Sequence, residues 1–205
     1  GIIGGFLSVS LLLTQGALYL QLKVKDILQE KLHRTIIYLN FITTILLIIS
    51  GSYALLKLKL YLPLKFSYDG PSNPLFKEIT GLGFYNVYMQ KPLLWFFPLA
   101  MMVVSVSISW LVKLHNKITA FIMHSILIAI VIAAFGVNLF PIIIPSSIDP
   151  VYSLMVWDAS SSERTLLIML IAVLLLLPIV LLYTSWMYKV FATAIGPKDI
   201  KEDMY

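Results

Sequence analysis

The stretch Ile118–Phe140, ITAFIMHSILIAIVIAAFGVNLF, is 23 residues long and contains no aspartate, glutamate, lysine or arginine. An α-helix of ~20 apolar residues is just long enough to cross the ~30 Å hydrocarbon layer of a membrane. Hydrocarbon supplies no water to the backbone, so a single segment of this kind crosses it as a helix, in which the amides are hydrogen-bonded internally. This stretch therefore predicts a transmembrane helix.

Four further apolar stretches of similar length accompany it, at residues 1–22, 36–56, 92–112 and 165–188. Aspartate, glutamate and arginine are absent from the interiors of all five, and His124 is the one residue well inside them that titrates near neutral pH. We predict an all-α fold, a polytopic transmembrane bundle of five helices. No hydrophilic stretch is large enough for a separate soluble domain, so we expect one transmembrane domain over residues 1–205.

The composition leads to the same class of protein. The chain is 60% hydrophobic and only 12% charged, which would leave a soluble domain with far too much exposed apolar surface. It has no cysteine, which excludes disulfides and thiolate metal sites. The net charge of +5 suits basic membrane loops, and we expect no nucleic-acid partner. Because Gly1 already lies in an apolar run, we expect this chain to be the C-terminal part of a longer subunit.

Basic residues are unevenly distributed between the two sides of the membrane that the five spans define. One side has the short loops 23–35 and 113–117 and the tail after Tyr188, with nine lysines and arginines. The other side has the longer loops 57–91 and 141–164, with six. The positive-inside rule therefore predicts that the first side, with the C-terminus, is cytoplasmic.

Local patterns predict where helices begin and bend. The segment from Ser160 to Glu163 has the spacing of a capping box, in which the serine hydroxyl accepts from a first-turn amide. Pro92 suits a first helical turn, and Pro178 predicts a kink inside the last span. The two prolines of segment 140–147 favour an extended connector over a continued helix.

The four tryptophans lie near the ends of predicted spans. Trp95 and Trp110 are about 22 Å apart along one helix, Trp157 precedes the last span, and Trp186 lies near its far end. Amphipathic indoles prefer the headgroup level. We interpret all four as membrane-interface residues, and not as part of a cofactor site.

A few polar side chains at membrane depth are candidates for function. His124 could be a haem ligand, a proton relay or a hydrogen-bond partner of a neighbouring helix, and we favour the last role. Gln15, Asn40 and Asn138 could likewise join helices through hydrogen bonds. No carboxylate lies in any span, so this stretch cannot by itself carry a conventional transmembrane proton path.

Small residues and one loop carboxylate complete the candidates. Ser105 and Ser109 are four apart on one face of the third span, as are Gly1 and Gly5 on the first, and both pairs would allow close helix contact. Asp158 could cap the last helix, bind a partner subunit or lie near a proton exit, and we favour capping.

Five motifs, in this order along the chain, resemble those of subunit II of the cytochrome bd-type quinol oxidases. They are TQGALYLQLK (14–23), SNPLFKE (72–78), the segment FP…PSS (140–147), WDASS (157–161) and YTSW (183–186). The resemblance extends over essentially all of the chain but corresponds only to the C-terminal portion of that subunit.

The resemblance implies a terminal oxidase of the bacterial inner membrane that oxidises quinol, reduces oxygen to water and generates proton-motive force without pumping. In that family two haems b and one haem d belong to subunit I, which also carries the quinol-oxidising loop. Subunit II is its structurally related partner and scaffold, with a proton route in its first half. We therefore expect no catalytic, cofactor-binding or metal-binding residue in this chain, and no axial ligation by His124.

Two other classes remain open. A fragment of a secondary transporter would place a substrate site at broken helices near mid-membrane, but Pro178 is the only deep break in the sequence. A structural anchor for another membrane enzyme differs from the first interpretation only in its partner. The choice between ubiquinol and menaquinol is also open.

Overall fold

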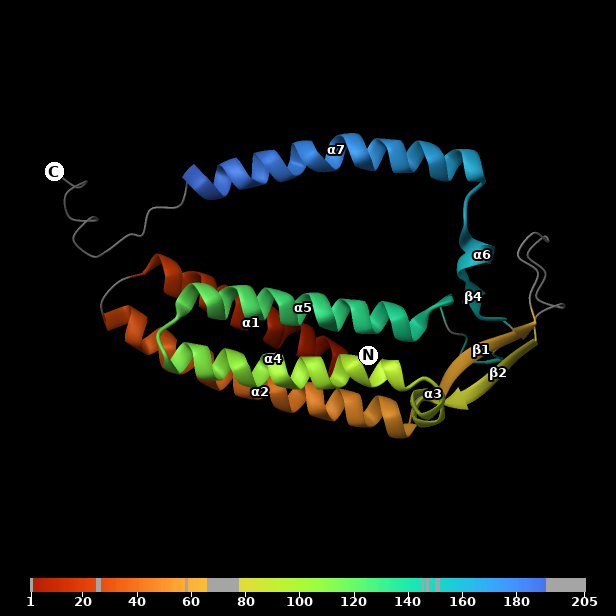
Figure 1. Ribbon diagram of the computed structural model, residues 1–205, viewed down its shortest axis with the longest axis horizontal. Coiled ribbons are helices and arrows are strands. Elements are labelled where there is room, and N and C mark those ends of the chain that lie inside the picture. Colours follow the sequence, from red (N-terminus) through yellow and green to blue (C-terminus); the bar gives the residue numbers. More distant parts are fainter. Residues whose placement is uncertain are drawn as a thin grey trace. The chain divides into compact units, whose positions relative to one another are not determined.

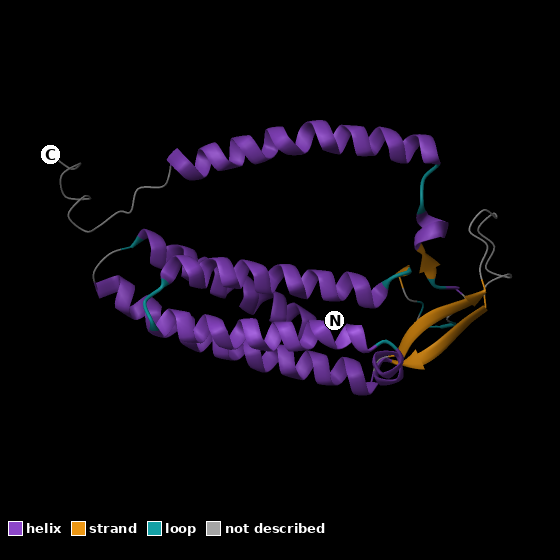
Figure 2. Cartoon of the chain, viewed as in Figure 1, coloured by secondary structure: helices purple, strands orange, loops and turns teal. Residues whose placement is uncertain are grey.

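The computed structural model describes residues 2–24, 27–57, 59–65, 78–144, 146, 148–149 and 152–190, without the side chains of residues 27, 59–65, 78–84 and 157–158. Five of its helices are long and apolar enough to cross a membrane, which confirms the predicted all-α polytopic bundle. Figures 1 and 2 show the elements. They are α1 (Ile2–Lys23), α2 (Ile27–Lys57), β1 (Lys59–Lys65), β2 (Glu78–Gly83), α3 (Phe84–Gln90), η2 (Pro92–Trp95), α4 (Phe96–Lys113), α5 (Lys117–Leu139), β3 (Ile142–Ile144), β4 (Leu154–Met155), α6 (Val156–Ala159) and α7 (Glu163–Val190).

Four of the long helices form one compact group. Helix α1 contacts α2 and α5, and α4 contacts the same two helices, so the four close into a ring. Short connections make sequential helices antiparallel. Figure 1 shows the end of α1, the start of α2 and the α4–α5 connection at the same end of this group. We call it the basic end because Lys23, Lys31, Lys113 and Lys117 lie in these parts of the helices.

Apolar side chains fill the centre of the four-helix group. Each helix contributes at least one residue to this core, which consists of Leu7, Leu11, Leu18, Ile36, Leu47, Ile108, Val112, Ala120 and Leu127. Equally apolar residues cover the outside, where Phe41, Val103 and Phe135 are each more than 60% exposed. A helix that is apolar on all sides is typical of a membrane span, because the bilayer accommodates the outer face.

Helix α2 begins earlier than predicted. The sequence placed a loop at 23–35, whereas the helix starts at Ile27. The extra turns consist of good helix formers, and Glu30 and Arg34 form an i,i+4 ion pair at 3.5 Å. At 1.5 Å per residue α2 is about 46 Å long, so its polar first turns extend beyond the ~30 Å hydrocarbon layer.

The third span begins as predicted at Pro92. A short 3-10 helix, η2, runs from Pro92 to Trp95, with the proline in its first turn, and α4 follows directly. Before it, α3 contacts both α2 and η2, and Tyr88 meets the Trp95 ring edge-on at 5.4 Å. Strands β1 and β2 form a two-stranded sheet, while most of the 72–78 motif lies outside the described residues.

A second compact unit includes residues 61–65 and 78–80 of the β1–β2 sheet and the described residues of 140–190. The proline-bounded segment after α5 is extended, as predicted: β3 pairs antiparallel with β4, joining Ile142 to Met155. The amide of Ser146 donates to the hydroxyl of Ser153 at 3.0 Å, which ties the loop between the strands. The side chains of Ile142 and Met155 are buried, so this pair forms a small apolar core.

The predicted capping box at the start of the last helix is wrong. The Ser160 hydroxyl donates to the carbonyl of Val156, at the preceding short helix α6, at 2.6 Å. Helix α7 begins at Glu163, and the flanking Ser162 hydroxyl hydrogen-bonds that of Thr165 at 3.0 Å. The side chain of Asp158, predicted to cap this helix, lies outside the described part. Helix α7 continues through Pro178, curved along its length in Figure 1.

Candidate functional site

Three sets of side-chain hydrogen bonds join the helices of the four-helix group, which we call the polar network. They connect α1 to α5, α2 to α4, and α1 to α2. All are made by neutral groups: amides, hydroxyls and one imidazole. The network lies within the apolar spans, where interhelical hydrogen bonds contribute to association because lipid provides no alternative partner.

The contact between α1 and α5 is centred on Gln15. Its Oε1 lies 2.6 Å from Nδ1 of His124, and its Nε2 donates to the hydroxyl of Ser125 at 2.9 Å. The His124 side chain is fully buried. The expectation that His124 is a buried histidine bonded to a neighbouring helix is therefore confirmed, and so is the expectation that Gln15 joins two helices.

The contact between α2 and α4 is centred on Asn40. Its Nδ2 donates to the carbonyl of Ser105 at 2.9 Å and to the hydroxyl of Ser109 at 2.7 Å. One turn further along α2, the hydroxyl of Thr44 lies 2.6 Å from that of Ser105. The two serines thus share one face of α4, as predicted from their spacing, and that face meets α2.

Besides their apolar packing, α1 and α2 are joined by hydrogen bonds between hydroxyl groups. Thr43 donates to the Ser10 hydroxyl at 3.1 Å, and the hydroxyls of Thr43 and Thr14 are 3.3 Å apart. All three side chains are buried. Each hydroxyl also lies within hydrogen-bond distance of a carbonyl one turn earlier in its own helix. Because a hydroxyl has a single proton, Thr43 donates either to that carbonyl or to Ser10.

Two candidate residues do not join helices. The amide of Asn138 donates to Ala134 in its own helix at 2.8 Å, so the predicted bridge to a neighbour is wrong for the described residues. A Cβ added at Gly5 would meet no atom within 4 Å, so this glycine marks no close helix contact. Gly1, its predicted companion, lies outside the described residues.

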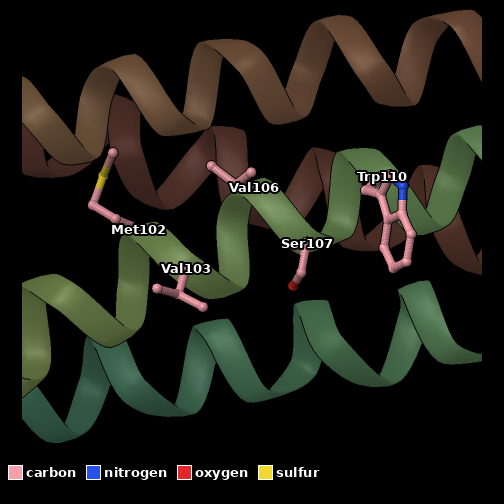
Figure 3. A pocket seen from close by; sticks show the side chains of 5 residues that line it. All are labelled: Met102, Val103, Val106, Ser107 and Trp110. Carbon is pink, nitrogen blue, oxygen red and sulfur yellow. The ribbon is translucent and has the colours of Figure 1, made fainter.

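An open apolar groove of about 440 Å³ runs along α4. Figure 3 shows the five residues that line it: Met102, Val103, Val106, Ser107 and Trp110. The Trp110 side chain is 62% exposed near the end of α4, as expected for a membrane-interface residue. An apolar outer groove at this depth can accommodate hydrocarbon.

A second cavity, of about 500 Å³, is polar and lies at the basic end. It is lined by Gln21 from the end of α1, by Gln29, Glu30, His33 and Arg34 from the first turns of α2, and by His115 between α4 and α5. The rings of His33 and His115 are stacked, with centroids 4.9 Å apart and planes inclined by 26°. His115 adopts a positive φ of 57° in the tight turn between its helices.

The residues described do not fit a haem at His124. The remaining ring nitrogen, Nε2, has no hydrogen-bond partner, but neighbouring atoms bury it completely. An iron could approach it only by displacing those atoms, and His124 lines neither of the two cavities. Among the described residues, no cluster of three His, Asp or Glu side chains could hold a metal ion.

The five spans and the neutral polar network define a multi-pass helical membrane protein. Residues 1–191 match the model of the cytochrome bd terminal oxidase subunit II family, and the chain belongs to this family. The resemblance of the five sequence motifs is thus confirmed.

Two curated relatives show how much of the subunit is present. A probable cytochrome oxidase subunit 2 of Haemophilus influenzae is 32% identical over 188 residues, which cover 90% of this chain and 50% of the relative. The cytochrome bd-I ubiquinol oxidase subunit 2 of Escherichia coli K12 is 30% identical over 210 residues, which cover 100% of this chain and 55% of the relative. The chain therefore spans about half the length of the curated relatives that it matches.

Sequence reasoning missed the hydroxyl partners in the network and the polar cavity. Ser10, Thr14 and Thr43 are too ordinary in membrane helices to stand out in a single sequence. The cavity had a weak signal: His33 and His115 lie in segments that the basic-residue count placed on the same side of the membrane. Only the packing of the four helix ends shows that their rings stack.

Proposed function

We propose that this chain is the non-haem-ligating subunit II portion of a cytochrome bd-type quinol:oxygen oxidoreductase. The observation that carries this proposal is the family match over residues 1–191. The whole complex oxidises quinol, reduces oxygen to water and generates proton-motive force in the bacterial inner membrane. The role of this portion is to scaffold the haem-bearing subunit I.

The geometry of the spans supports a scaffold more than a catalytic role. The polar side chains of the network are used in contacts between helices, and the described network contains no carboxylate. The buried Nε2 of His124 leaves no approach for an iron. We therefore assign the two haems b and the haem d to subunit I, and assign no catalytic, cofactor-binding or metal-binding residue to this chain.

We infer from the composition of helix α7 that it lies against lipid or against a partner subunit. It has 28 residues, and its residues 166–182 contain no polar side chain. Helices that are apolar on all sides are stable only when lipid or protein surrounds them. We propose that the basic end and the C-terminus face the cytoplasm, and the excess of basic residues in the short loops on that side supports this orientation.

A reduced-minus-oxidised visible spectrum of the intact purified complex tests this function. An affinity tag on this subunit should co-purify subunit I, and the spectrum should contain bands of haem b and haem d. The pigment should remain in the other polypeptide when the subunits are separated under conditions that preserve haem ligation. A colourless preparation would refute the oxidase assignment, and haem retained by this subunit alone would refute the scaffold role.

A secondary transporter is the alternative class. It would require interrupted helices facing each other near mid-membrane. Among the described spans, α1, α2, α4 and α5 are continuous in the apolar region, and α7 continues through Pro178. The absence of haem from a pure complex, together with uptake of a solute into proteoliposomes, would favour the transporter.

A further inference from the structure

We propose that the polar cavity at the basic end binds the headgroup of a membrane phospholipid that carries both a phosphate and a primary ammonium group. The cavity lies where the apolar spans end, which is the depth of lipid headgroups. The inference depends on membrane insertion of the four helices and not on the proposed oxidase activity.

Two buried polar atoms at the cavity lack partners among the described residues. They are Oε1 of Gln21, whose side chain is only 2% exposed, and Nδ1 of His33. Both side chains line the cavity. Buried polar atoms are nearly always hydrogen-bonded. Neighbouring atoms cover both atoms, but the two side chains line the cavity, so a small rotation of either side chain would expose its atom to a ligand there. A ligand with both donors and acceptors would then satisfy this pair, because the carboxamide oxygen requires a donor and the imidazole nitrogen can bond a phosphate oxygen.

The charged residues at the rim of the cavity likewise include one hydrogen-bond acceptor and one donor. Glu30 and Arg34 lie 3.5 Å apart, and their side chains are 77% and 76% exposed. An ion pair this exposed is weak, so either partner can exchange it for a ligand. The carboxylate of Glu30 can accept from an ammonium group, and the guanidinium of Arg34 can donate two hydrogen bonds to a phosphate.

Other basic side chains lie in the helix ends on the same side of the group without lining the cavity. Lys23, Lys31, Lys113 and Lys117 all lie in the terminal turns at this end. Basic pockets between membrane helices bind lipid headgroups by attraction to the phosphate. These lysines attract any phospholipid, whereas the cavity itself can distinguish headgroups: choline has no N–H to donate, and glycerol has no positive charge for Glu30.

Native mass spectrometry of the intact complex can count the lipids that it retains. The complex is stripped of lipid and titrated with phosphatidylethanolamine, phosphatidylcholine or phosphatidylglycerol of identical acyl chains. We expect the wild type to bind one phosphatidylethanolamine about ten-fold more tightly than phosphatidylcholine, since a hydrogen bond to a charged group accounts for that factor. Equal affinity for the three lipids would overturn the proposal.

Substitutions at the exposed rim test the contacts to the ammonium group and to the phosphate separately. Glu30→Gln should abolish the preference for ethanolamine over choline while the phosphate is still bound. Arg34→Gln should weaken the binding of all three lipids. Lys31→Gln, which removes a charge at the same end but outside the cavity lining, is the matched control and should keep the preference. A preference lost in Lys31→Gln but kept in Glu30→Gln would overturn the assignment.

A soluble ligand is distinguished by competition. Free phosphoethanolamine carries the same polar groups without acyl chains. We expect it to displace the lipid only at concentrations far above those at which the lipid binds. Binding of free phosphoethanolamine as tight as that of the lipid would overturn the assignment to a membrane lipid. None of these measurements depends on haem content or turnover.

Discussion

Replacing Gln15 by leucine should destabilise the four-helix group by more than the hydrogen bonds that it removes. The substitution eliminates the bonds to His124 and Ser125. Interhelical hydrogen bonds in membranes contribute about 0.6 kcal/mol each on average. It also leaves the fully buried imidazole of His124 with no partner on either nitrogen, which costs about 1–3 kcal/mol. The expected loss is therefore about 2–4 kcal/mol.

A double-mutant cycle with His124→Leu tests this reasoning. The double variant no longer contains an unpartnered buried imidazole, so it should be more stable than Gln15→Leu alone. Unfolding of the purified protein in mixed micelles, followed by steric trapping or by SDS titration, gives the four free energies. Ser8→Leu is the control, because Ser8 is exposed on α1 and bonds only its own helix, at Gly4. A double variant that loses as much as the two single variants combined would refute the reasoning.

The remaining predictions concern α4 and its neighbours. Asn40→Leu should destabilise the four-helix group by about 1–2 kcal/mol, because two hydrogen bonds to Ser105 and Ser109 are lost. Asn138→Leu is the matched control: the Asn138 amide donates within its own helix, so its loss should cost less than about 0.5 kcal/mol. Titration with SDS compares the free energies of unfolding of the two variants. Ser109→Phe should lower the haem content of the assembled complex by separating α4 from α2, although the substitution replaces no residue that we assign to haem binding. Ser107→Phe, two residues away in the outer groove, should leave the pyridine haemochrome assay unchanged. Normal haem content in Ser109→Phe would contradict a packing role for this face.

The long helices could be predicted from the sequence because their cause is local. A run of ~20 apolar residues has one stable conformation in hydrocarbon, whatever surrounds it. The end of Ile118–Phe140 was equally predictable, since Pro141 and Pro145 cannot continue the helix. The start of α2 was predicted too late, because hydropathy marks where a helix enters the membrane and not where the helix begins. Most of residues 27–35 are polar, but they still form helix.

The partners of polar residues depend on three-dimensional packing. Gln15 and Asn138 are both amides in apolar spans, yet one bridges two helices and the other bonds its own backbone. The difference lies in whether the side chain faces a neighbour, and a single sequence without clear periodicity does not show that. The Ser160–Glu163 pattern failed because α7 begins only at Glu163, so Ser160 lies before the helix, where its hydroxyl donates to the carbonyl of Val156 in α6.

The hydrogen bonds of the polar network, as far as the structure describes them, contain no permanently charged group. A potential of 100 mV does about 2.3 kcal/mol of work on each elementary charge that moves across a membrane. Because these hydrogen bonds join neutral groups, the membrane potential exerts no net force on the groups that form them. The four helices should consequently keep the same spacing in an energised membrane and in a depolarised one, which would make this part of the protein a fixed frame while the electric field around it rises and falls.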